Sequence, residues 1–123
     1  MTLTNKKTLV LGASLNPQRY SNLAIHCLVE KNIEVVAICL RKGVVAGIPV
    51  YTKKKKFKNI HTVTLYLNAK RQEAYYDYIL SLKPKRVIFN PGTENEAFIK
   101  ILKDNNIEAE VACTLVLLRM NLY

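Results

Sequence analysis

A glycine turn near the start of the chain is the first place where the residue types could do chemistry. The apolar run at residues 8–11 stops at Gly12-Ala13-Ser14, and a helical pattern begins a few residues later. A buried strand that passes through a glycine into a helix presents free backbone N–H groups to a phosphate. Gly12 permits close approach of the backbone to a ligand, and the small side chain of Ala13 leaves space beside the turn. The Ser14 hydroxyl can donate to a ligand oxygen. The sequence therefore predicts a phosphate-binding turn, although a glycine with only a turn-forming role explains the pattern equally well.

The residues that follow depart from the standard dinucleotide pattern. Leu15, Asn16 and Pro17 stand where the later glycines of G-x-G-x-x-G would come, so that fingerprint is absent. Enzymes that use NAD place an Asp or Glu after the second strand to bind the ribose hydroxyls, whereas this chain has Arg41 and Lys42 there. Two cations suit a ribose with a further phosphate, such as the 2′-phosphate of NADP or the 3′-phosphate of coenzyme A. Two exposed loop cations of a basic protein explain them equally well.

The elements that would position these residues alternate between strand and helix. Almost continuously apolar runs predict buried strands, and helical periodicity predicts helices between them. The predicted strands cover residues 8–11, 34–39, 63–67, 86–89 and 107–111, and the predicted helices cover residues 22–31, 71–82, 98–103 and 113–118. Strands that alternate with helices form parallel sheets with right-handed crossovers. We therefore predict an α/β fold, a three-layer sandwich around a five-stranded, mainly parallel sheet, in one domain over residues 1–123.

Two kinds of connection can be predicted between these elements. Asn32 and Asn105-Asn106 tolerate the left-handed backbone conformation that closes many helices, so they predict the returns from helix to strand. Residues 43–60 show little helical periodicity and contain a glycine, a proline and a run of lysines. We expect a short helix or an irregular loop in that crossover.

Two loops border the predicted ligand crevice. In open α/β sheets, ligands lie across the carboxyl ends of the strands, where the strand order reverses. If the first strand is central, residues 12–21 lie on one side of that crevice and Asn90-Pro91-Gly92 on the other. Ser21 or Asn22 is expected to cap the first helix. Thr93-Glu94-Asn95-Glu96 has the pattern of a capping box, which fixes the start of the next helix.

Length, charge and cysteine content limit the classes of protein that this chain can belong to. The 123 residues suit one compact domain, and a net charge of +10 favours anionic partners. Cys27, Cys39 and Cys113 are an odd number without a C-x-x-C spacing, which favours reduced thiols over a disulfide or a metal site. No apolar stretch of the sequence has the length of a signal peptide or of a membrane span. We therefore predict a cytoplasmic protein that binds no metal and no membrane.

The run Lys53-Lys54-Lys55-Lys56-Phe57-Lys58 holds much of the excess positive charge. Such a run can follow a nucleic-acid backbone or simply face water. A single aromatic residue interrupts it and no arginine does. The solvated surface is therefore the favoured interpretation, and a nucleic-acid partner is disfavoured.

The order of these features resembles a known family. The features are Gly12-Ala13-Ser14 with Pro17, Arg19-Tyr20-Ser21-Asn22, Arg41 after the second strand, Gly47-Ile48-Pro49-Val50-Tyr51, Asn90-Pro91-Gly92 with Glu94-Asn95-Glu96, and Cys113. Together they resemble the small single-domain CoA-binding proteins, which are similar to the nucleotide-binding domain of the succinyl-CoA synthetase α-subunit. The resemblance extends from about residue 7 to residue 118, and residues 12–22 and 90–96 are its more specific parts.

The resemblance implies a Rossmann-like fold that binds coenzyme A. The pyrophosphate would lie on residues 12–14 and the helix start, and the 3′-phosphate of the adenosine would lie near Arg41 and Lys42. Arg19 matches a basic position close to the phosphates, and residues 90–92 would border the pantetheine. The predicted cofactor-binding residues are Gly12, Ala13, Ser14, Arg19, Tyr20, Ser21, Asn22, Arg41, Lys42, Asn90, Pro91 and Gly92. The family commonly ends its second strand in Asn-Pro, where this chain has Cys39-Leu40.

No catalytic constellation can be assigned from the sequence. His26 falls in the middle of the first helix and His61 at the start of the third strand, so neither is expected at the crevice. Cys113 has no basic partner nearby in the sequence and is interpreted as a core thiol. We therefore predict a noncatalytic binding module for coenzyme A or an acyl-CoA.

Two other functions stay open at this point. One is an enzyme that uses NADP or another nucleotide, for which Tyr20 would be the proton donor. The other is a nucleic-acid-binding protein that works through residues 53–58. The sequence also leaves open a partner protein or a homodimer.

Overall fold

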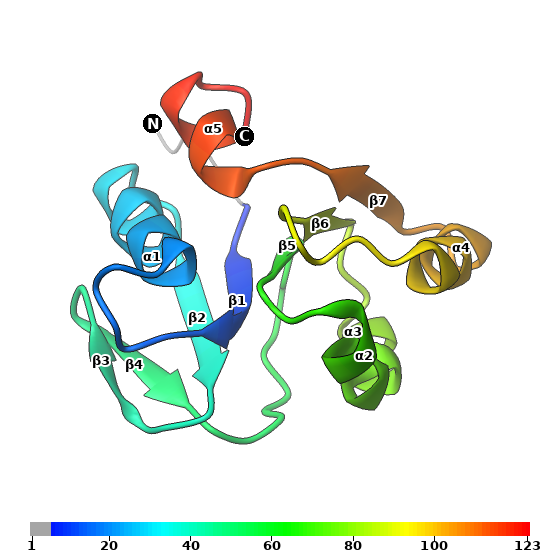
Figure 1. The fold of residues 1–123 in the computed structure, drawn as a ribbon, viewed down its shortest axis with the longest axis horizontal. Helices are drawn as coiled ribbons and strands as arrows, with labels where there is room; N and C mark the ends of the chain where they lie inside the picture. Colours follow the sequence, from blue (N-terminus) through cyan, green and yellow to red (C-terminus); the bar gives the residue numbers. More distant parts are fainter. Residues whose placement is uncertain (1–5) are drawn as a thin grey trace.

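The computed structural model describes residues 6–123, which form a seven-stranded sheet in the order β3-β4-β2-β1-β5-β6-β7 (Figure 1). The strands are β1 (Thr8–Ala13), β2 (Val35–Cys39), β3 (Gly43–Val45), β4 (Ile48–Tyr51), β5 (Thr62–Leu65), β6 (Arg86–Phe89) and β7 (Glu108–Val111). The helices are α1 (Tyr20–Glu30), α2 (Ala69–Gln72), the 3₁₀ helix η1 (Glu73–Tyr75), α3 (Tyr76–Leu82), α4 (Glu96–Asp104) and α5 (Thr114–Arg119). Paired strands are parallel except β3 and β4. The predicted α/β class with a mainly parallel sheet is therefore confirmed.

The prediction of five strands was wrong, because residues 43–60 contain a hairpin. β3 and β4 pair in antiparallel fashion, and Ala46 and Gly47 join them with φ angles of 51° and 79°. Positive φ at both turn residues matches the twist of the flanking strands, as two-residue hairpins require. Glycine is common at such a turn, whereas alanine is rare there. Ala46 in the turn and Pro49 inside β4 concealed both strands in the sequence.

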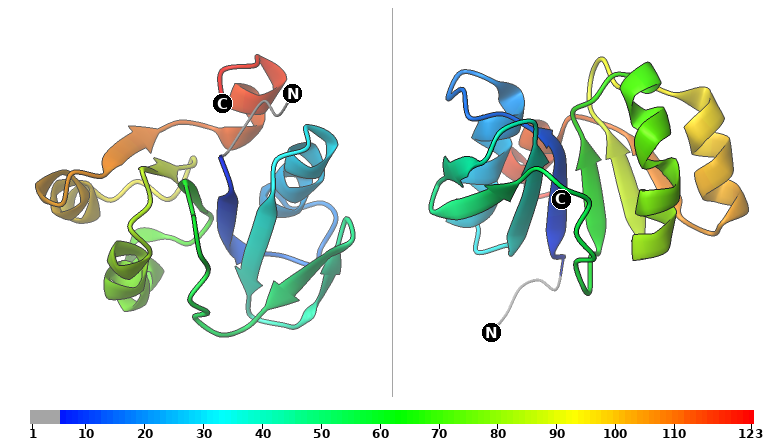
Figure 2. Two further views of the ribbon diagram at one scale, coloured as in Figure 1. Left: turned by 180° about the vertical axis from the view of Figure 1, so that it is seen from behind. Right: turned by 90° about the horizontal axis from the view of Figure 1, so that it is seen from below.

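Helices cover both faces of the sheet and make the predicted three layers. α1 and α5 pack on one face, whereas the segment from α2 to α3 and helix α4 pack on the other (Figure 1). Figure 2 shows the same two layers from behind and from below. None of the helices formed by residues 6–123 has the length and the apolarity that a membrane crossing needs.

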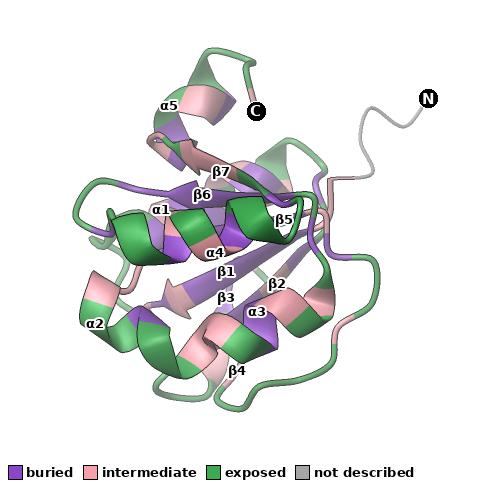
Figure 3. Cartoon of the chain, turned by 90° about the vertical axis from the view of Figure 1, so that its right-hand side faces the viewer, coloured by how far each residue is buried: buried purple, intermediate pink, exposed green. Residues whose placement is uncertain are grey.

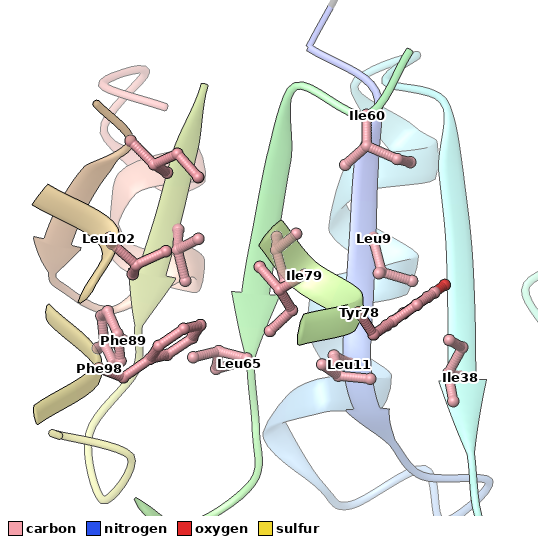
Figure 4. Packing of buried hydrophobic residues seen from close by; sticks show 13 residues of the cluster. Leu9, Leu11, Ile38, Ile60, Leu65, Tyr78, Ile79, Phe89, Phe98 and Leu102 are labelled. Atoms are coloured by element: carbon pink, nitrogen blue, oxygen red, sulfur yellow. The ribbon is translucent and has the colours of Figure 1, made fainter. Parts of the chain in front are cut away.

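β1 is the centre of the core, since both of its faces are fully buried. Leu9 and Leu11 point to the α3 and α4 layer, where Tyr78 and Ile79 of α3 lie near them (Figure 4). Val10 points to the opposite face, which α1 covers. All three strand residues are 0% exposed, as expected for a central strand of a parallel sheet. In contrast, α3 and α4 keep solvent-exposed outer surfaces (Figure 3).

The turns that lead from helix to strand at asparagine residues lie where the sequence predicts them. Asn32 and Asn106 have φ angles of 60° and 59°, so the left-handed helix ends predicted there are confirmed. The predicted helix at residues 71–82 instead begins at Ala69 and is interrupted by η1. The capping box predicted at residues 93–96 does not form, because Asn95 is the N-cap of α4 and its Oδ1 accepts from the Phe98 N–H at 3.1 Å.

Candidate functional site

A cavity of about 760 Å³ opens at the carboxyl ends of β1 and β2. β2 lies on one side of β1 and β5 on the other, so the strand order reverses at this point. Ligands of open α/β sheets bind at such a reversal. The lining comes from the end of β1, the loop after it and the start of α1 (Gly12, Ala13, Ser14, Leu15, Asn16, Arg19, Tyr20, Ser21), from the end of β2 and the residues after it (Ile38, Cys39, Leu40, Arg41), and from the segment after β5 (Tyr66, Leu67, Arg71, Tyr75).

Gly12 is required by the packing of the chain itself. Its φ is +90°, and a Cβ would lie 2.9 Å from Leu67 Cδ2 and 3.0 Å from the carbonyl carbon of Tyr66. The left-handed backbone and the close approach both disfavour a larger residue. The end of β1 can therefore lie directly against the segment after β5. This structural role of Gly12 exists whether or not a phosphate lies over the turn.

The N-terminus of α1 faces the cavity without a side-chain cap. Arg19 is the N-cap residue, its side chain caps no N–H group, and the first turn contains no acidic residue. The predicted capping by Ser21 or Asn22 was therefore wrong. Along the described residues, the backbone N–H groups of Tyr20 and Ser21 have no acceptor within the chain. Such a helix end carries unpaired donors and a partial positive charge, which favour an anion.

The loop between β1 and α1 is held in place by its own polar groups. Asn22 Nδ2 donates to the Ser14 carbonyl at 2.9 Å, so Asn22 stands behind the loop and positions it. The Asn16 N–H donates to Ser14 Oγ at 3.1 Å. Since that bond uses an oxygen lone pair, the Ser14 hydroxyl proton is left to donate to a ligand.

Three arginines from three different segments line the cavity. Arg19 starts α1, Arg41 follows β2, and Arg71 belongs to α2. All three are exposed, and the ion pairs found among residues 6–123 involve other cations. Lys42, predicted as a second phosphate ligand, lies in the lining of a separate cavity of about 500 Å³ together with residues of β3 and β4. The cavity at the end of β1 is thus basic through arginine.

The loop after β6 does not reach this cavity. Asn90 is 2% exposed, and its Nδ2 donates to Thr64 Oγ1 at 2.7 Å and to the Leu65 carbonyl at 2.8 Å. Its Oδ1 accepts from the Thr114 N–H at 2.9 Å. The side chain therefore ties β6 to β5 and to the start of α5. Pro91 and Gly92 are exposed, and neither is part of the cavity lining.

The segment after β5 holds the site residues that the sequence reasoning missed. Tyr66 and Leu67 directly follow β5, the strand beside β1, and Arg71 and Tyr75 lie one helical segment further on. With β1 flanked by β2 and β5, the loop after β5 takes the place that was predicted for residues 90–92. Knowing that the strand order reverses at β1 would have indicated Tyr66 and Leu67 as cavity residues. No local sequence signal indicates that Arg71 and Tyr75 line the cavity.

The wall at Tyr75 is fastened by the lysine run. Lys54 Nζ donates to the Ala74 carbonyl and lies 5.0 Å from the centre of the Tyr75 ring. The hydroxyl of Tyr78 donates to the Lys55 carbonyl, and Lys55 Nζ lies 4.2 Å from the centre of the Tyr51 ring. These contacts hold part of the run against the fold. The lysines at positions 53–56 and 58 are all exposed, as the interpretation of the run as a solvated surface expects.

The cavity offers donors rather than bases. Burial raises the pKa of Tyr66 to about 12, and its hydroxyl interacts with Thr64 and Thr114 inside the fold. Cys39 Sγ accepts from the Arg41 N–H at 3.5 Å, and all three cysteines of the chain are free thiols. Among the described residues that line the cavity there is no His, Lys, Asp or Glu. The arrangement is therefore suited to holding an anion.

The fold and the place of the cavity define a doubly wound α/β domain with its cavity at the strand-order reversal. The family model of the CoA binding domain matches residues 6–119. The chain therefore belongs to this family of CoA-binding domains, as the sequence resemblance implied.

Solved structures share the fold of this chain. The crystal structure of an uncharacterized protein is 46% identical to this chain with a TM-score of 0.93, and the match covers 96% of this chain and 98% of that one. A Thermus thermophilus protein is 21% identical with a TM-score of 0.81, over 96% and 90% of the two chains. A hypothetical protein from Pyrococcus horikoshii OT3 is 24% identical with a TM-score of 0.79, over 95% and 83%. The last two show likeness of fold alone. None of the curated proteins matches the chain.

Proposed function

We propose that this protein binds coenzyme A or an acyl-CoA as a noncatalytic binding module. The diphosphate lies over residues 12–14 and the start of α1, and the 3′-phosphate of the adenosine lies beside Arg41. The observation that carries this proposal is that the uncapped N-terminus of α1 and Arg41 line the same cavity, which has no carboxylate in its described lining.

The two ends of the cavity fit two different phosphates. At β1, the free N–H groups of Tyr20 and Ser21, the Ser14 hydroxyl and the Arg19 guanidinium are all donors. At β2, which lies about 4.8 Å from β1 as adjacent strands do, Arg41 supplies a second positive charge. A ligand that carries a diphosphate and, one ribose away, a monophosphate matches this arrangement.

Arg41 and Lys42 provide a matched pair of variants, because only Arg41 lines this cavity. We expect Arg41→Ala to weaken coenzyme A binding about tenfold or more, since a hydrogen bond between charged groups contributes about 1.5–3 kcal/mol. Lys42→Ala should bind nearly as the wild type does. Isothermal titration calorimetry with coenzyme A and with dephospho-CoA measures both effects. With dephospho-CoA, which lacks the 3′-phosphate, Arg41→Ala should lose almost nothing.

The same titrations separate this proposal from its alternatives. Wild-type protein that binds coenzyme A and dephospho-CoA equally would contradict the role of Arg41. Binding of NADP but not of coenzyme A would favour a nucleotide-dependent enzyme. Steeply salt-dependent binding of a short DNA duplex, lost when residues 53–58 are neutralised, would favour a nucleic-acid-binding protein. Release of free thiol from acetyl-CoA by the wild-type protein would overturn the noncatalytic role.

A further inference from the structure

Arg71 lines the cavity from the opposite side of the sheet to Arg19. α1, which begins after Arg19, packs on one face, and α2, which contains Arg71, belongs to the layer on the other face (Figure 1). Both arginines nevertheless reach the cavity at the carboxyl end of β1. A ligand in that cavity therefore lies between two guanidinium groups that come from different layers.

The backbone that carries Arg71 is firmly held. Asn68 Oδ1 accepts from the Arg71 N–H at 2.9 Å and so caps α2. The next residue, Gln72, is 0% exposed, and its Nε2 donates to the carbonyls of Leu67 and Thr93 at 2.8 and 2.7 Å. These bonds fasten α2 to the segment after β5 and to the loop after β6. The Arg71 backbone thus has a fixed position at the cavity wall. This lowers the conformational entropy that is lost when a ligand binds to the side chain.

Within residues 6–123, the Arg71 guanidinium forms no ion pair. It is exposed, and among residues 6–123 the carboxylates that form ion pairs are Glu34 and Glu110, which pair with Lys7 and Arg86. An arginine that is held at a cavity and pairs with no carboxylate suits an anionic ligand group, because its planar fork matches two phosphate oxygens.

The strand order decides which anion Arg71 meets. Arg41 follows β2 on one side of β1, and Arg71 follows β5 on the other. With the 3′-phosphate at Arg41 and the diphosphate at β1, the pantetheine arm leaves toward β5. That arm carries no anionic group, so the diphosphate is the anion within reach of Arg71. We propose, on the basis of the proposed function, that Arg71 is a second diphosphate-binding residue, which clamps the diphosphate from the face opposite to Arg19.

Lys70 supplies the control for this inference, since it is an exposed cation of the same helix outside the cavity lining. The experiment is calorimetric titration of wild-type protein, Arg71→Ala, Arg71→Lys and Lys70→Ala with coenzyme A and with dephospho-CoA. We expect Arg71→Ala to lose about tenfold in affinity for both ligands by the same factor, because both contain the diphosphate. Arg71→Lys should lose less, and Lys70→Ala should lose less than twofold.

Each failure has a distinct meaning. Arg71→Ala that binds as tightly as Lys70→Ala overturns the clamp while binding of coenzyme A by the wild type still stands. A loss that occurs with coenzyme A but vanishes with dephospho-CoA assigns Arg71 to the 3′-phosphate and overturns its placement at the diphosphate. Wild-type protein that binds neither ligand overturns the proposed function itself. Thermal unfolding without ligand shows whether each variant is folded.

Discussion

The end of β1 and the loop after β6 each contain a glycine with a left-handed φ angle but use their polar groups in different ways. Gly12 near the end of β1 and Gly92 after β6 have φ angles of 90° and 89°, and each of these buried parallel strands leads through a loop toward a helix. After β6, the Asn90 side chain forms hydrogen bonds to β5 and to the start of α5, and Asn95 caps α4. After β1, helix α1 begins without a side-chain cap at the wall of a cavity.

This difference separates a structural loop from a candidate binding loop. Buried polar groups are nearly always paired in a folded protein, so a fully paired loop has little left to offer a ligand. The unpaired N–H groups of α1 and the exposed arginines at the cavity keep their hydrogen-bonding capacity. The location of unpaired donors therefore indicates the site better than the glycine-containing motif does.

The largest effect is expected from alanine in place of Gly12, with Gly92 as the matched control. Both substitutions force alanine into a left-handed conformation, which costs about 1–2 kcal/mol. A Cβ at Gly12 also meets Leu67 Cδ2 at 2.9 Å, whereas a Cβ at Gly92 meets nothing within 4 Å. Overpacking adds about 1–3 kcal/mol, so Gly12→Ala should lose roughly 2–5 kcal/mol in total and Gly92→Ala only the strain.

Urea denaturation of both variants measures the free energy of unfolding and isolates the packing contribution as the difference between them. The double variant Gly12→Ala, Leu67→Ala should recover part of the loss that comes from the close contact. Equal losses for Gly12→Ala and Gly92→Ala would show that Gly12 has no packing role, and would leave the proximity of a ligand as the reason for a glycine there.

A somewhat smaller effect is expected from Asn90→Ala. The substitution leaves the Thr114 N–H and the Leu65 carbonyl without their partner in the core, and each such loss costs about 1–3 kcal/mol. We expect a total of roughly 3 kcal/mol by urea denaturation, with unchanged coenzyme A affinity of the folded protein. Pro91→Ala, at the exposed neighbour, should cost less than about 1 kcal/mol. Weaker coenzyme A binding by folded Asn90→Ala would return the loop after β6 to the site.

The strands and most helices could be predicted because their signals are local. Sequence patterns predicted five of the six strands that pair in parallel, all except β4, to within a few residues, and Asn32 and Asn106 gave two helix ends through their tolerance of left-handed backbone. The hairpin of β3 and β4 escaped because Ala46 lacks the usual turn signal. Ala13, Ser14, Arg19 and Arg41 were predicted as site residues and do line one cavity.

The rest of the cavity depends on tertiary structure. Arg71 and Tyr75 enter the lining because β5 pairs with β1 and because Lys54 and Gln72 anchor the segment that carries them. The bonds from Lys54 to Ala74 and from Gln72 to Thr93 join residues 20 and 21 positions apart, so no short window of sequence contains them. The use of Asn90 inside the fold likewise depends on its contacts with Thr64 and Thr114, which only the packed structure brings near.

The smallest effect on the free energy of unfolding is expected from His61, at the amino end of β5, where polar side chains again bond to one another. His61 Nδ1 lies 2.7 Å from Thr62 Oγ1, which also accepts from Arg86 Nε at 3.1 Å. Burial, and next the positive charge of Arg86, lower the pKa of His61 below its ordinary value of 6.5. Because the unfolded chain then binds a proton more readily than the folded one, the free energy of unfolding should be constant well above pH 6.5 and should fall as the pH drops below it.

Replacing His61 by a side chain that does not titrate in this range removes its contribution to the pH dependence of the free energy of unfolding. We expect the urea midpoint of His61→Gln to fall less steeply than that of the wild type between about pH 7 and pH 5. His26→Gln, at an exposed position of α1, is the control for replacing a histidine by glutamine elsewhere in the chain. Since His61 lies outside the cavity lining, His61→Gln should also bind coenzyme A as the wild type does at neutral pH. A parallel decline of all three midpoints would assign the acid sensitivity to other groups, and weakened binding would extend the site to the amino end of the sheet.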